Sequence, residues 1–160
     1  MAKGHEGQPP PAADWGPTVV RVIVGFMFFM YGWDKFFELG LDFWEGLFDA
    51  QGIPAPRFAA VMIALLELLG GVALVVGFLT REVAALLTID MIVAILVVGL
   101  DGGFYVWDNG VSFPLALLAG TLALVLMGSG EAAVDRVSGW SPIESALGSI
   151  TSPRGNRTPY

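Results

Sequence analysis

The stretch FAAVMIALLELLGGVALVVGFL, residues 58–79, decides the class of this chain. It is one continuous apolar run of the length that a membrane-spanning helix needs, about 17–25 residues. Its middle carries a single charged side chain, Glu67. A charge at the centre of a membrane helix costs about 2.5–3.5 kcal/mol even on lenient insertion scales, so it normally has a partner and a use. Glu67 is therefore the first candidate functional residue.

The composition of the whole chain is typical of a membrane protein. Of the 160 residues, 55% are hydrophobic and only 14% are charged, and the mean hydropathy is +0.69, outside the usual soluble range. Four apolar stretches are long enough to span a bilayer if the shorter ones tilt or thin it locally: residues 17–37, 57–79, 83–100 and 111–127. We therefore predict an all-α protein, an integral membrane four-helix bundle without a separate soluble domain.

The two ends of the chain are rich in proline, glycine and polar residues, with little to bury. We expect residues 1–16 to form a mobile N-terminal tail, residues 17–136 the four-helix transmembrane domain, and residues 137–160 a cytoplasmic C-terminal tail. An amphipathic cytoplasmic segment is expected over residues 131–149. A signal peptide is the alternative for the first helix, but its apolar run is too long and no small-residue cleavage site follows.

A short amphipathic segment, LDFWEGLFDA at residues 41–50, separates the first two spans. A helix here places aromatic and aliphatic side chains on one face and carboxylates on the other, and the Gly- and Pro-containing residues 52–56 end it. We predict a short interfacial helix. It is either a structural lid resting on the outer leaflet or a gate over a lipid-facing pocket.

The distribution of basic residues predicts the orientation. One side carries Lys3, Arg21, Arg81, Arg136, Arg154 and Arg157, whereas the other has only Lys35 and Arg57. Both termini should therefore be cytoplasmic, and most of the net charge of -7 should lie on the opposite, acidic surface.

Several classes of cofactor lack their usual ligands. The chain has no cysteine, and its single histidine, His5, lies in the polar N-terminal tail. No iron–sulfur cluster, haem, flavin or metal site is therefore expected. Phosphate-binding glycine loops and basic nucleic-acid patches are also lacking, so nucleic acid is not an expected partner.

The charged residues of the spans fall on faces that also carry small residues, which lets helices approach closely. On the first span this face is Arg21, Gly25, Phe28, Gly32 and Lys35; on the second it includes Glu67 and Gly71, and on the third Asp90 and Asp101. Helix rise places Arg21 at ~6 Å, Asp90 at ~12 Å, Glu67 at ~18 Å and Lys35 at ~25 Å above the cytoplasmic ends.

These residues form a polar ladder in which Glu67 should point into the bundle. We expect Arg21 or Arg81 to neutralise it, unless it is protonated and hydrogen-bonded. Two interpretations stay open. The ladder is either an internal ion-pair network that fixes helix register, or a proton path or head-group pocket.

The residues also match a known family. The string ALLELLGGVALVVGFLTREVAALLTIDM at residues 64–91, the pattern R-x3-G-x6-G-x2-K from Arg21 to Lys35, and GSGEAAVDR at residues 128–136 resemble the DoxX family of small four-helix membrane proteins. Members often carry a carboxylate just before the last helix, where this chain has Ser112; the resemblance makes Asp108, one turn earlier, the expected substitute.

The resemblance implies a multi-pass protein of a prokaryotic plasma membrane, with two alternatives for its role. The first is a quinone-linked subunit of a membrane redox complex, with Glu67 and Asp90 as catalytic proton carriers and Arg21, Lys35 and Arg81 binding the quinone. The second is a non-catalytic scaffold that anchors soluble redox enzymes. Its partners would be the bilayer, other subunits and further copies of itself. A small-molecule carrier is disfavoured because four helices show no inverted repeat.

Overall fold

A computed structural model describes residues 12–99, 103–108, 110–130 and 132–134. Within these ranges the chain forms five α-helices and no β-strand, which confirms the all-α prediction. The elements are α1 (Ala12–Trp33), the π-helical turn η1 (Asp34–Glu38), α2 (Leu41–Ala50), α3 (Pro56–Val76), α4 (Thr80–Ala94), the π-helical turn η2 (Ile95–Gly99), the 3-10 helix η3 (Val106–Asp108) and α5 (Ser112–Met127). Most of both predicted tails, almost all of segment 131–149, and Asp101 lie outside the described residues.

The helix boundaries differ from the sequence prediction at the turn between α3 and α4. Gly77 adopts a left-handed φ of 78°, and its N–H bonds the carbonyls of Ala73 and Leu74, so α3 ends at Val76. Helix α4 begins directly afterwards at Thr80, three residues before the predicted start at residue 83. The predicted span left out Arg81 and Glu82, which lie in the first turn of α4.

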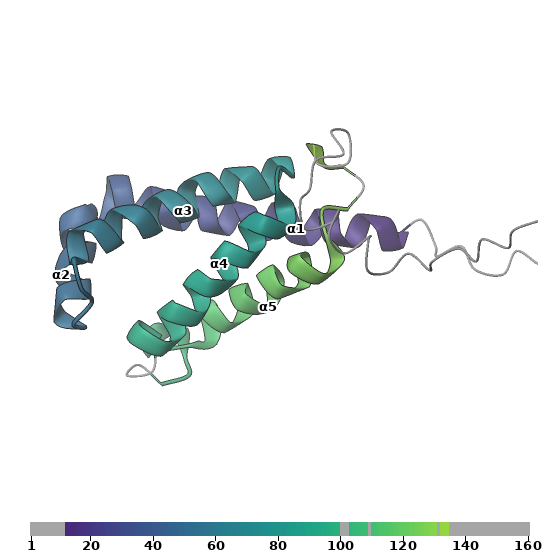
Figure 1. Cartoon of the computed structure of the whole chain (residues 1–160). Coiled ribbons are helices and arrows are strands. Elements are labelled where there is room, and N and C mark those ends of the chain that lie inside the picture. The colour runs from purple at the N-terminus through teal and green to yellow at the C-terminus, as the bar shows by residue number, and fades with distance from the viewer. Residues whose placement is uncertain (1–11, 100–102, 109, 131, 135–160) are drawn as a thin grey trace, which may run out of the picture.

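The long helices pack in two pairs, α1 against α3 and α4 against α5 (Figure 1). The two pairs lie close together near the α3–α4 turn and diverge toward the end where α2 lies. Glycines allow α1 and α3 to approach closely. A Cβ on Gly71 would lie 2.4 Å from the backbone nitrogen of Phe29, and one on Gly32 would lie 2.4 Å from that of Leu68. These contacts fix the register of α1 against α3.

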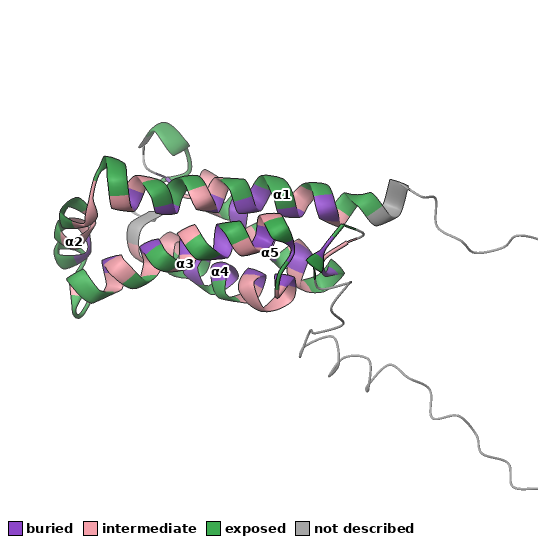
Figure 2. Ribbon diagram, turned by 90° about the horizontal axis from the view of Figure 1, so that it is seen from above, coloured by how far each residue is buried: buried purple, intermediate pink, exposed green. Residues whose placement is uncertain are grey.

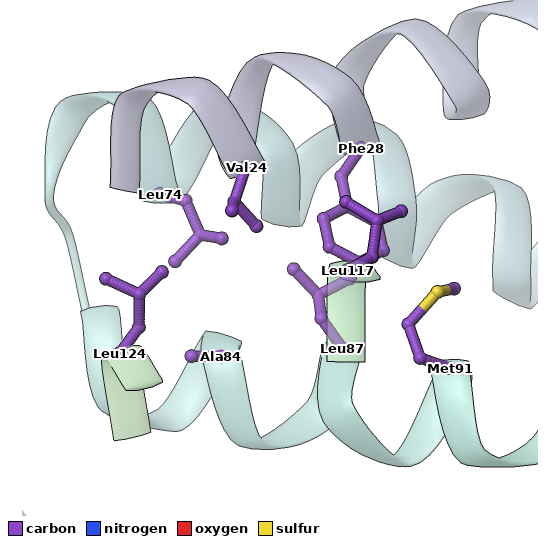
Figure 3. Packing of buried hydrophobic residues seen from close by; sticks show 8 residues of the cluster. All are labelled: Val24, Phe28, Leu74, Ala84, Leu87, Met91, Leu117 and Leu124. Atoms are coloured by element: carbon purple, nitrogen blue, oxygen red, sulfur yellow. The ribbon is translucent and has the colours of Figure 1, made fainter. Parts of the chain in front are cut away.

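An apolar core joins the two pairs, as the side chains in Figure 3 show. Its buried members come from all four long helices: Val24, Phe28, Leu74, Ala84, Leu87, Met91, Leu117 and Leu124. Figure 2 shows exposed residues along all the long helices, and many of these are apolar, with Phe26 58%, Leu69 62% and Leu126 77% exposed. Extensive exposed apolar surface marks contact with lipid or with another protein.

Two helical segments are long and apolar enough to cross a membrane, Trp15–Glu38 and Pro56–Val76. Helix α5 is apolar but shorter. Two of the four predicted spans therefore meet this criterion within the part of the chain that the structure describes. The predicted short helix between the first two long helices is confirmed as α2, with the bounds expected from the sequence.

Candidate functional site

A pocket of about 690 Å³ lies at the end of the molecule where α2 packs. Helices α1, α2, α3, α4 and α5 all contribute to it, and most of its lining is aliphatic or aromatic. Its size falls within the range of small-molecule binding pockets, roughly 300–1,000 Å³. Three charged side chains line it, namely Lys35, Glu67 and Asp90. An apolar pocket with a few convergent polar groups is the usual form of a ligand site.

Lys35 and Glu67 form a buried ion pair in this pocket. Nζ of Lys35 lies 2.5 Å from Oε2 of Glu67, and each side chain is only 5% exposed. The register of α1 against α3 explains the pairing. Gly32 packs on Leu68. Lys35 follows in the π-helical turn η1, and helical side chains tilt toward the N-terminus, which brings Lys35 toward Glu67.

Asp90 brings a second carboxylate to the same pocket from α4. Its residue is 7% exposed, and it lies within electrostatic range of both Lys35 and Glu67. Oδ2 of Asp90 is buried and has no hydrogen-bond partner among the described residues. Burial of an unsatisfied polar atom is costly, so a ligand or a proton would stabilise this carboxylate.

Aromatic side chains cover the ion pair from the α1 and α2 sides. Nζ of Lys35 lies 4.3 Å from the ring centroid of Trp44 and 5.7 Å from that of Tyr31, within cation–π distance. Nε1 of Trp44 is also buried without a hydrogen-bond partner in the described part of the chain. The pocket therefore offers an unused donor on Trp44 and an unused acceptor on Asp90.

Helix α2 is tied to the start of α3 by charged side chains. Arg57 donates hydrogen bonds to Oδ1 of Asp42 and, at 2.8 Å, to Oε2 of Glu45. This pair of contacts joins the polar face of α2 to the first turn of α3. The apolar face, including Phe43, Trp44 and Phe48, then lines the pocket. Residues of α2 thus line the pocket, and the choice between a structural lid and a gate stays a prediction.

The expected partners of Glu67 were wrong. The sequence predicted that Arg21 or Arg81 neutralises it, whereas the structure pairs it with Lys35. Arg21 is buried near the α3–α4 turn, where its Nη2 donates to the carbonyl of Ala132, and Nη2 of Arg81 lies 3.5 Å from the carbonyl of Leu126. Both arginines therefore lie outside the pocket lining and hold the other end of the bundle together. Their role in binding a cofactor stays a prediction.

Sequence reasoning missed Trp44 and Tyr31 as pocket residues. The apolar face of α2 was the only available signal for Trp44, because its contact with Lys35 depends on how α2 packs against α3 and η1. The predicted substitute for the family carboxylate, Asp108, lies in η3, and Ser112 opens α5. Neither residue lines the pocket.

The fold and the pocket define a small helical membrane protein with an ion pair buried beneath a short covering helix. The chain belongs to the DoxX family, whose model matches residues 16–100. This match includes α1 from Gly16 onward, α2, α3, α4 and the three charged residues of the pocket.

Bacterial relatives cover most of the chain. "Putative oxidoreductase CatD" of Bacillus subtilis is 36% identical over 120 residues, which are 75% of this chain and 84% of that relative. A membrane protein of Mycobacterium tuberculosis is 32% identical over 139 residues, covering 78% of this chain and 83% of the relative. "Inner membrane protein YqjF" of Escherichia coli is 30% identical over 127 residues, covering 78% and 92%. No solved structure matches the chain.

Proposed function

We propose that this DoxX-family protein is a quinone-linked subunit of a membrane redox complex, and that the pocket beneath α2 receives the quinone head group. The observation that carries the proposal is the combination of apolar and aromatic walls with the Lys35–Glu67 pair and Asp90 in one pocket. The name of the Bacillus relative, an oxidoreductase, points to the same class of chemistry.

The residues present fit a quinone. Its two carbonyl oxygens accept hydrogen bonds, which Nε1 of Trp44 and Nζ of Lys35 can donate, while the apolar lining suits the ring and the first part of the tail. A bound quinone supplies an acceptor for two electrons and two protons. Glu67 and Asp90 are carboxyl groups that can hold and release protons at this place. The proposal assigns the supply of the two electrons to another protein of the complex.

The same proposal includes the finer topology. The four long helices α1, α3, α4 and α5 span a bacterial plasma membrane, both termini are cytoplasmic, and α2 lies on the outer surface. The excess of lysine and arginine on the side of the termini supports this orientation. In this arrangement, other members of the complex would deliver electrons to the quinone bound in this subunit.

The substitution Glu67→Gln tests the proposed function. It keeps the shape of the side chain but removes the charge and the titratable proton. Quinone-dependent turnover of the native complex, normalised to the amount of assembled complex, should fall by about 10²-fold or more, the scale of a positioned acid–base group. Glu38→Gln makes the same chemical change at an exposed position outside the pocket lining, and its turnover should equal that of the wild type.

An unchanged normalised turnover in Glu67→Gln would contradict the proposal. If recovery of the complex then fell while turnover per complex stayed constant, the protein would be the non-catalytic scaffold. The lower recovery would then reflect destabilisation of the protein, because Glu67→Gln leaves Lys35 without its counter-ion.

A further inference from the structure

We propose that the pocket beneath α2 also binds lipophilic organic cations, a class of ligand that the quinone-linked function does not require. The inference rests on the charges and the aromatic side chains that line the pocket. It holds whether or not a quinone binds in the same pocket. The juxtaposition that carries it is a buried carboxylate, Asp90, set beside an ion pair that is already complete, inside a cage of aromatic rings.

The formal charges of the three charged side chains that line the pocket sum to minus one. Lys35 and Glu67 compensate each other at 2.5 Å, and Asp90 is the third charged residue of the lining. Oδ2 of Asp90 is buried without a hydrogen-bond partner among the described residues. A buried carboxylate without compensation is stabilised by a positively charged group that enters the pocket.

The side chains that line the pocket favour an organic cation over a metal ion. Aromatic residues contribute from three helices, with Tyr31 on α1, Trp44 and Phe48 on α2, and Phe113 on α5. Aromatic faces attract organic cations, and cation–π contact already holds Nζ of Lys35 over Trp44. The described residues contain no group of three His, Cys, Asp or Glu side chains that could hold a metal. A cation with apolar substituents satisfies the carboxylate and the rings together.

The test compares two ions with the same tetraphenyl frame and opposite charge, tetraphenylphosphonium and tetraphenylborate. Equilibrium dialysis against the purified full-length protein in a non-ionic detergent, corrected with empty micelles, gives both affinities. We expect saturable 1:1 binding of the phosphonium, at least about 10-fold tighter than binding of the borate, because only the cation compensates Asp90.

Variants locate the binding. Asp90→Asn should weaken phosphonium binding by about 10-fold or more, and Trp44→Leu should weaken it by several-fold through loss of the aromatic face. Asp49→Asn removes an equivalent charge outside the pocket lining and should leave the affinity within about 2-fold of the wild type. Trp44→Leu keeps every charge, so it decides the question even if Asp90→Asn does not fold. Equal affinity for the two ions, or wild-type phosphonium affinity in both pocket variants, would overturn the inference.

Discussion

The Lys35–Glu67 pair is the residue-scale feature on which the pocket depends, because both side chains are buried at 5% exposure. Lys35→Met leaves the Glu67 carboxylate without its counter-ion. Breaking a buried pair in this way costs about 3–5 kcal/mol, whereas replacing both partners with apolar residues of similar size is often neutral. We therefore predict a large fall in unfolding free energy in detergent for Lys35→Met, and recovery of most of it in the double variant Lys35→Met/Glu67→Leu. If both variants were destabilised equally, the loss in Lys35→Met could not be attributed to a Glu67 carboxylate without its counter-ion.

The sequence identified the charged residues of the pocket correctly, but it did not predict which of them form an ion pair. An isolated carboxylate in an apolar run identified Glu67, and helical spacing placed Lys35 on an inward face. The ladder put Lys35, Glu67 and Asp90 on neighbouring levels, and these three do line one pocket. Arg21 does not join them. Arg21 lies 14 residues before Lys35, roughly 21 Å along the helix axis. The ladder joined the two only by assuming that each charge pairs with the next one in depth.

At the scale of elements, the contact between α1 and α3 depends on glycine. A Cβ on Gly71 would meet backbone atoms of Phe29 and Gly25, which no side-chain rotation can relieve. Gly71→Ala should therefore lower the unfolding free energy by about 1–3 kcal/mol, the usual cost of overpacking. Thermal unfolding in detergent measures the change.

Gly46 in α2 provides the matched control for this substitution. A Cβ there would meet nothing within 4 Å, so Gly46→Ala should keep or raise stability by up to about 1 kcal/mol through helix propensity. Destabilisation of both variants by the same amount would contradict the packing argument, because the loss could then not come from the α1–α3 contact.

The elements themselves were largely predictable from periodicity and turn chemistry. The amphipathic pattern at residues 41–50 gave the bounds of α2, and the apolar runs gave the long helices. The missed boundary lies at residues 77–79, where a left-handed Gly77 and a left-handed Leu79 make the turn unusually tight. Leucine is an uncommon residue at positive φ, so no sequence rule would have placed the start of α4 at Thr80.

At the scale of the whole molecule, the four-span topology can be tested because the chain has no cysteine. Asp49→Cys lies on the exposed face of α2, and Ala132→Cys is an exposed position after α5. A membrane-impermeant maleimide should label Asp49→Cys in intact cells and Ala132→Cys only after lysis. Modification of Asp49→Cys from the cytoplasmic side alone, or of both positions from one side, would contradict the topology.

Photolabelling with a reactive quinone analogue tests the central claim, that the pocket beneath α2 receives a quinone. In native membranes the label should be mapped by mass spectrometry to pocket residues of α1, α2 and α4, such as Tyr31, Trp44 and Met91. An excess of unlabelled quinone should abolish this labelling, and Glu38→Gln should not change it. Labelling confined to the outer faces of the helices, or labelling of the pocket that excess quinone does not reduce, would contradict the claim.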